Sequence, residues 1–284
     1  MKLKVLLLVI AILCLSFFVV ACGEDDTTTA GETPDGTTTA ATTTKETTKK
    51  TTKVTSCKCT TPVATTTIVP AELIAKLPAK LPDNSTYDIH TRIGLETADD
   101  YLSISGNYQN LKFTTEGAIH GNGLSMEVNP QDQYPRVQAF LDLLDPFMPE
   151  GVKGIMWHVD FSAAAPVDGK PMCTSTTINV NNYRANHGGT GTAKGYYFKD
   201  GAWVETTNVN ACRMEIPNNF KGWVYIPLSE YWKSGSSDAS GDLFDASTKL
   251  GLSNVIISNI RLYTDGYEMV AGKPIIFDEV LYVK

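Results

Sequence analysis

The feature that most constrains this chain is a series of short segments, from about residue 88 to its end, in which apolar and polar residues alternate. In one of them, Ile155, Trp157, Val159 and Phe161 fall at every second position. A period of two with β-branched and aromatic residues is typical of strands with one buried face. The other runs are 124–128, 177–181, 194–198, 202–206, 223–228, 255–263 and 275–283. Many short strands with turn-rich connections predict an all-β fold, either a two-sheet sandwich or a closed barrel.

Three local features refine this prediction. Lys199-Asp200-Gly201 separates two alternating runs and predicts a hairpin turn. The segment 134–147 has a weak helical pattern, and prolines within and after it would keep such a helix short. Residues 68–87 hold Pro70, Pro78 and Pro82, so we expect a lead-in with no more than a turn or two of helix.

The start of the chain has the marks of an export signal, with basic residues followed by an apolar run from Val5 to Ala21. Val19-Val20-Ala21-Cys22 resembles the bacterial lipobox, in which the cysteine becomes the lipid-modified first residue of the mature protein. The resemblance implies a signal peptide over 1–21 and a lipid on Cys22 that anchors the chain to the membrane. An uncleaved transmembrane helix is the alternative, although 17 residues are few for a bilayer core. Under either interpretation the rest of the chain lies outside the cytoplasm.

The segment 22–67 is rich in threonine and almost free of large apolar residues, so we expect a disordered tether. As a random coil of about 45 residues it would hold the domain over 88–284 roughly 35–40 Å from its anchor. The net charge of −7 argues against nucleic acid or an anionic membrane face as a partner. The sequence does not predict an oligomeric state.

Two cysteines, Cys173 and Cys212, lie in the part of the chain that we expect to fold. Outside the cytoplasm such a pair can form a disulfide. Sequence spacing alone does not place their Cα atoms within bridging distance, so a disulfide and two free thiols both stay open.

Several segments, taken in order, resemble jelly-roll carbohydrate-binding modules of the galactose-binding-like type. Ile93–Glu96 and Gly121–Val128 are similar to the first strands of such modules, and Gly154–Val159 to the strand that follows. Phe220–Leu228 resembles their "Phe-Lys-Gly-aromatic-Val-x-Ile-Pro-Leu" strand, and Ile275–Tyr282 their last strand. The resemblance covers residues 88–284 and implies a jelly-roll β-sandwich of two antiparallel sheets.

The same resemblance implies a structural calcium ion that ties the first strand to the last, with Glu96 and Asp278 at the matching positions. Calcium takes six to eight oxygen ligands, and carboxylates supply them well. The alternative is that both residues are surface carboxylates or pair with lysine or arginine. We expect no other cofactor.

A sandwich that binds sugars needs aromatic rings against which a pyranose can stack, and polar side chains for its hydroxyl groups. In the run 223–228, Val224 and Ile226 are the natural core pair, so Trp223 and Tyr225 would face away from the core. Tyr197 and Trp203 flank the predicted hairpin and could pair across its strands. We therefore expect an aromatic platform of Trp223, Tyr225, Trp203 and Tyr197, with plain packing as the alternative for each ring.

Polar candidates for the same site follow from alternation. Since Trp157 belongs with the core face of its strand, His158 and Asp160 should point outward. Tyr183 and Arg184 complete the set.

Three functions remain open at this stage. The first is a membrane-anchored surface lipoprotein that binds a glycan without catalysis. The second is a glycoside hydrolase or polysaccharide lyase on a jelly-roll scaffold, for which no catalytic residues can be named from sequence. The third is a structural or protein-binding surface module, because this kind of sandwich hosts unrelated functions.

Overall fold

The computed structural model describes residues 68–130, 136–166, 168–180, 183–188, 193–210, 213–233, 256–266 and 269–284. The predicted signal peptide, the lipidated Cys22 and the tether lie outside these residues. The described residues belong to one unit that runs from Thr65 to Lys284. Within these ranges, no helix has both the length and the apolar character to cross a membrane.

The described part of the chain consists mainly of antiparallel strands, with one short α-helix and two 3-10 turns. The strands are β1 (Ile89–Ile93), β2 (Ser103–Asn107), β3 (Gln109–Thr114), β4 (Gly123–Glu127), β5 (Arg136–Phe147), β6 (Gly154–Asp160), β7 (Met172–Val180), β8 (Tyr183–His187), β9 (Lys194–Lys199), β10 (Ala202–Asn210), β11 (Arg213–Ile216), β12 (Lys221–Pro227), β13 (Tyr231–Lys233), β14 (Ile257–Gly266) and β15 (Pro274–Val283). The helical segments are α2 (Ala71–Ile74), η1 (Ala98–Asp100) and η2 (Leu228–Glu230).

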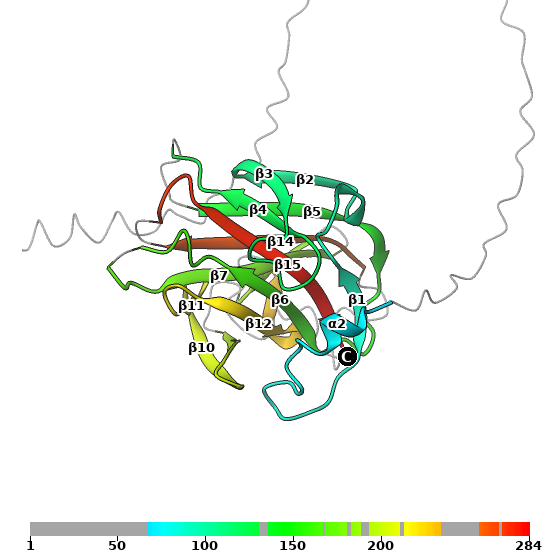
Figure 1. The fold of residues 1–284 in the computed structure, drawn as a ribbon. Helices are drawn as coiled ribbons and strands as arrows, with labels where there is room; N and C mark the ends of the chain where they lie inside the picture. Colours follow the sequence, from blue (N-terminus) through cyan, green and yellow to red (C-terminus); the bar gives the residue numbers. More distant parts are fainter. Residues whose placement is uncertain are drawn as a thin grey trace, which may run out of the picture. The chain divides into compact units, whose positions relative to one another are not determined.

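These strands form two antiparallel sheets that pack as a sandwich (Figure 1). Sheet A has the order β3-β4-β15-β6-β12-β9, and β1 also pairs with β15. Sheet B has the order β2-β5-β14-β7-β11, with β8 on β7 and β13 on β8. Strand β10 joins the two, because it pairs with β9 at its start and with β11 at its end. The predicted all-β sandwich of two antiparallel sheets is confirmed.

The main hydrophobic core lies between the sheets. Strand β6 contributes Ile155, Trp157 and Val159, and β14 contributes Ile260 and Leu262, all of them fully buried. The alternation read from the sequence therefore assigned Trp157 correctly to the core. Burial of this kind stabilises the fold by about 25 cal/mol for each Å² of apolar surface removed from water.

A second hydrophobic cluster lies on the outer face of sheet A. Residues 69–87, here called the strap, run across this face, and the strap's Leu73 and Leu81 are buried there. The strap includes α2, a helix of four residues that begins directly after Pro70. The prediction of no more than a turn or two of helix between the prolines is confirmed. Backbone hydrogen bonds of 2.9 Å in both directions between Asp88 and Lys284 then lead the chain into β1. The proline-containing lead-in is thus packed onto the sandwich.

Two local predictions have opposite outcomes. The hairpin is confirmed: Lys199 pairs with Ala202, and Asp200 and Gly201 both have positive φ, at 52° and 82°. This is the conformation of a two-residue turn between twisted strands. The helix over 134–147 is wrong where the structure describes it, because 136–147 is strand β5. Its residues Val137, Ala139, Leu141 and Leu143 face the core at every second position, and sheet pairing on both sides outweighs the weak helical pattern.

Candidate functional site

The predicted aromatic platform lies on the outer face of sheet A, but the strap covers most of it. Trp223 and Tyr225 face away from the main core, as alternation predicted, yet only 3% and 4% of their surfaces are exposed. The indole N–H of Trp223 donates to the backbone oxygen of Lys76 at 2.9 Å. The indole N–H of Trp203 donates to that of Lys80 at 2.7 Å. Both indole N–H groups therefore hold the chain's own strap.

Tyr197 does not belong to this platform. It packs against the main core, with its ring edge-on to Phe220 at 5.6 Å between centroids. The cross-strand partner of Trp203 is Phe198, whose ring lies edge-on at 5.2 Å. The predicted pairing of Tyr197 with Trp203 is wrong because the two-residue turn shifts the register by one, which puts these rings on opposite faces.

His158 and Asp160 point to the outer face of sheet A, but neither is an open contact site. His158 is 3% exposed, and burial, aided by Lys221, lowers the pKa of His158 to about 3. Its ring lies edge-on to Trp223 at 5.5 Å. Burial alone would raise the pKa of Asp160, but hydrogen bonds from Ser162 and Lys221 outweigh it and lower that pKa. Lys221 Nζ lies 3.0 Å from Asp160, so this carboxylate already has a cationic partner.

The predicted calcium ligands lie in a cluster of charged residues where the first and last strands meet. Asp278 is fully buried and accepts from the backbone N–H groups of Ile119 at 2.7 Å and His120 at 3.3 Å. The neighbouring Glu279 has a positive φ of 51°, where the register of β15 shifts. Side-chain atoms of Glu96, His120 and Glu279 all lie within 4.8 Å of one another, close enough to share an ion.

Arg92 occupies the centre of that cluster. Its guanidinium donates to both oxygens of Glu279, at 2.7 and 2.6 Å, and to Glu96 at 2.5 Å. Burial would lower the pKa of Arg92, but the two carboxylates outweigh it and raise that pKa above the usual value. The positive charge that calcium would bring is thus already present in a side chain, and the third group of the cluster is a histidine, not an oxygen ligand. These residues fit an arginine-centred ion-pair cluster better than a calcium site.

The remaining predicted residues lie on or near sheet B. Arg184 is exposed on β8, and Tyr183 begins that strand. Cys173 is half-buried on β7, whereas Cys212 lies outside the described residues, so the disulfide stays a prediction.

The sequence did not predict the arrangement of side chains across the outer face of sheet B. Residues that are directly opposite in neighbouring strands share a face, and the strand registers connect six of them in one line. This central row runs Ser105, Phe140, Arg261, Thr177, Asn186 and Trp232, on β2, β5, β14, β7, β8 and β13. It brings two half-buried aromatic rings onto one line across the sheet, with three hydrogen-bonding side chains between them that are themselves largely buried.

Arg261 contacts residues of the central row and of the next row on the same face, in which Gln138 lies opposite Tyr263. Its guanidinium carbon lies 5.2 Å from the ring centre of Phe140 and 5.7 Å from that of Tyr263. Its Nη1 donates to Gln138 Oε1 at 3.1 Å. Cation–π contacts and this hydrogen bond hold the arginine in place between two rings. Arg184 belongs to a third row on the same face, opposite Asn179.

Comparisons with known proteins give a likeness in structure alone. No family model matches this chain, and no curated protein matches it either. A carbohydrate-binding module, CBM27-1, of Caldicellulosiruptor saccharolyticus, solved with mannohexaose, is 12% identical, with a TM-score of 0.35 over 68% of this chain and 96% of that one. A family 11 carbohydrate-binding module of Clostridium thermocellum, solved with a β-1,3-1,4-mixed-linked tetrasaccharide, is 13% identical, with a TM-score of 0.35 over 67% and 95%. A module specific for non-crystalline cellulose, CBM28, is 12% identical, with a TM-score of 0.30 over 62% and 86%. At these values the likeness carries no functional argument.

Proposed function

We propose that this chain is a lipid-anchored surface protein that binds carbohydrate without catalysis, through the outer face of sheet B. The observation that carries the proposal is the central row. Phe140 and Trp232, both half-buried, supply rings for stacking. Arg261 and Asn186 lie between them with only 9% and 8% of their surfaces exposed, so each offers a polar edge to a ligand, and Thr177, at 2%, lies beneath. Rings next to planar or hydroxyl-bearing side chains are the combination that a sugar with one apolar face and several hydroxyl groups requires.

The length of the row indicates the class of ligand. Neighbouring strands lie about 4.8 Å apart, so five steps from Ser105 to Trp232 span roughly 24 Å. A row of this length suits several consecutive residues of a linear polysaccharide better than a single sugar. Each stacked ring and hydrogen bond contributes modestly, so we expect dissociation constants in the micromolar to millimolar range.

The composition of the row favours binding over hydrolysis. Glycoside hydrolases in most families need two carboxyl groups on opposite sides of the scissile bond. None of the six residues of the central row is acidic. Release of new reducing ends from any polysaccharide would instead support the enzyme alternative.

The anchor rests on the amino-terminal sequence. A lipid on Cys22 would hold the binding face outside the cytoplasm on a threonine-rich tether. Replacing Cys22 with serine should move the protein from the membrane fraction to the soluble fraction, while labelled palmitate should no longer be incorporated. Unchanged membrane retention of the serine variant would favour the transmembrane helix.

A pair of tryptophan variants tests the binding site. The full-length protein in detergent is titrated by calorimetry with soluble mannans, mixed-linked glucans and cello-oligosaccharides. Trp232→Ala should weaken binding at least tenfold, or about 1.4 kcal/mol. Trp203→Ala, the matched change on sheet A, should leave it within twofold. If Trp203→Ala weakens binding and Trp232→Ala does not, the site would instead lie on the predicted platform of sheet A. Absence of heat across the panel with a folded protein would favour the structural or protein-binding module.

A further inference from the structure

A cavity of about 530 Å³ opens at one end of the outer face of sheet A. Four segments of the chain line it: the strap at Leu81–Asp83, the loop 149–153 that precedes β6, strand β9, and the continuous segment of β12 and η2. The volume lies within the 300–1,000 Å³ typical of small-molecule sites. The cavity contains none of the residues of the central row, so it is independent of the site on sheet B.

Two tyrosine rings form part of its lining. Tyr196 on β9 and Tyr225 on β12 are cross-strand partners, with ring centres 6.2 Å apart and planes tilted by 38°. Tyr225 is the member of the predicted platform that lines this cavity. The other apolar lining residues are Leu81, Pro82, Pro149, Val152, Pro227 and Leu228.

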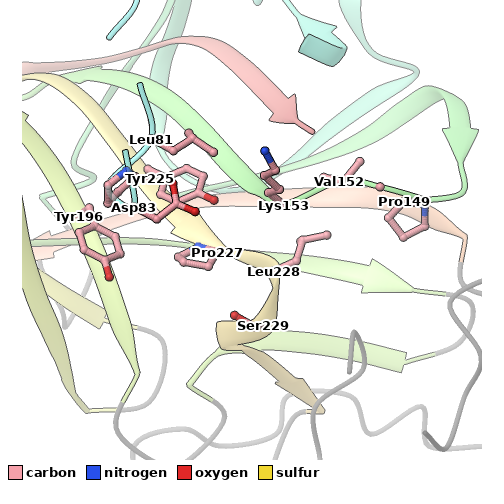
Figure 2. A pocket seen from close by; sticks show the side chains of 12 residues that line it. Leu81, Asp83, Pro149, Val152, Lys153, Tyr196, Tyr225, Pro227, Leu228 and Ser229 are labelled. Atoms are coloured by element: carbon pink, nitrogen blue, oxygen red, sulfur yellow. The ribbon is translucent and has the colours of Figure 1, made fainter. Parts of the chain in front are cut away.

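Polar groups lie among these apolar walls. Figure 2 shows Asp83 near the two tyrosines, Lys153 on the other side of the cavity, and Ser229 along its lower edge. The Asp83 carboxylate accepts from the backbone N–H of Ser85 at 2.9 Å, and hydrogen bonds from Ser85 lower the pKa of Asp83, so it stays ionised. Lys153 Nζ donates to the backbone oxygen of Thr86 at 3.0 Å and keeps further N–H donors.

We propose that this cavity binds the end of a saccharide, one or two pyranose residues long. The opposite charges of Asp83 and Lys153 balance each other, which favours a neutral ligand. Adjacent hydroxyl groups suit the pair, since one can donate to the carboxylate while its neighbour accepts from the ammonium group. The tyrosine rings and the prolines then offer apolar surface to the C–H face of the sugar.

The size and boundaries of this cavity explain why we assign the end of a saccharide chain to it. The central row on sheet B crosses six strands and can accept the interior of a long chain. The cavity is instead walled by the strap, the 149–153 loop and η2, whose 3-10 turn carries Leu228 and Ser229. A recess of about 530 Å³ between these segments has room for one or two pyranose residues, but not for the several consecutive residues that the central row can span.

Methyl glycosides of glucose, mannose and galactose are the probes, titrated into the full-length protein in detergent. Saturation-transfer NMR reports binding on the ligand. Tryptophan fluorescence, compared with that of Trp203→Phe to isolate the contribution of Trp203, reports it on the protein, because the Trp203 ring lies 5.9 Å from that of Tyr225. We expect at least one glycoside to bind with a millimolar dissociation constant. Asp83→Asn and Lys153→Met should each weaken it at least tenfold, and thermal unfolding checks that both variants are folded.

Controls on the two sheets separate this proposal from the proposed function. Trp232→Ala should leave glycoside binding unchanged, and Asp83→Asn should leave polysaccharide binding unchanged. If the wild-type protein binds glycosides but no polysaccharide, the function proposed for sheet B is wrong and the cavity proposal stands. Absence of any glycoside signal with folded wild-type protein would overturn the cavity proposal. Binding of zwitterionic amino acids in place of glycosides, lost in the same two variants, would overturn it too.

Discussion

Asp278 on β15 and His158 on β6 lie directly opposite each other, both buried on the outer face of sheet A. Among the described residues, neither Asp278 Oδ1 nor His158 Nδ1 has a hydrogen-bond partner. Burial, with Glu279 adding to it, raises the pKa of Asp278 to about 7. Burial lowers the pKa of His158 to about 3. The environment therefore favours the neutral form of both members of the pair.

The raised pKa of Asp278 predicts a loss of stability as the pH rises. Its ordinary pKa is 3.8, so the folded state holds a proton that the unfolded state releases between about pH 4 and 7, and the contribution to stability falls over that window. Asp278→Asn keeps an acceptor for the backbone N–H groups but no charge. We expect this variant to be more stable than wild type at pH 8, by on the order of 1–4 kcal/mol, and equally stable near pH 4. Urea unfolding at both pH values measures this.

His158→Gln serves as the matched control for that experiment. Since the folded-state pKa of His158 is lowered, its contribution to stability is lost as the pH falls from 6.5 towards 3. The glutamine variant should therefore lose this decrease in stability at low pH. Its change in the slope of unfolding free energy against pH is opposite in sign to that of Asp278→Asn. If Asp278→Asn leaves the pH dependence of stability unaltered, the assignment of a raised pKa to Asp278 is wrong.

Trp223→Phe should loosen the strap and leave the sandwich folded. The change removes the hydrogen bond to the Lys76 oxygen and keeps most of the buried ring, at a cost of about 1 kcal/mol. Hydrogen exchange should speed up at strap amides, and proteases should cut within the strap sooner. Trp232→Phe is the control, because the indole N–H of Trp232 donates to Ser229, outside the strap. Equal exchange rates in the two variants would count against the clamping role of Trp223.

The arginine-centred cluster predicts that calcium does not change the stability of the domain. Thermal unfolding of the wild-type protein should give the same midpoint in millimolar calcium and in EDTA. Arg92→Met should cost about 3–5 kcal/mol, since it leaves the buried Glu279 without its cation. Lys221→Met, which breaks a half-exposed pair with Asp160, should cost less than about 1 kcal/mol. A wild-type midpoint that falls in EDTA would instead support the calcium predicted at Glu96 and Asp278.

Gly106 on β2 should tolerate no side chain. Its φ is +137°, and a Cβ atom there would lie 2.1 Å from the backbone oxygen of Gln138 on β5. Gly106→Ala should therefore separate β2 from β5 and lower the free energy of unfolding by several kcal/mol, roughly 3 or more. Gly151→Ala is the control: its φ is also positive, at 74°, but nothing lies within 4 Å, so about 1–2 kcal/mol of backbone strain is expected. Denaturant unfolding compares the two, and equal losses would contradict the clash.

The sequence predicted the direction in which side chains point better than it predicted what covers them. Alternation placed Trp157 inward and Trp223 outward, and both placements are confirmed. Exposure of Trp223 could not be predicted in the same way, because the strap residue that covers it is 147 positions away. The central row was missed for a related reason: it exists only through the registers of six strands, which a single sequence does not specify.

The strap is the first part of the domain to bear a pulling force applied through the amino-terminal segment. Any pull transmitted along the backbone from residues before 68 reaches the strap before it reaches β1. We expect the strap to peel away first, because a few isolated side-chain hydrogen bonds and buried leucines hold it, whereas β1 is held by a ladder along β15. Such peeling would expose Trp203 and Trp223 and remove one wall of the cavity, while the strands that carry the central row would stay paired.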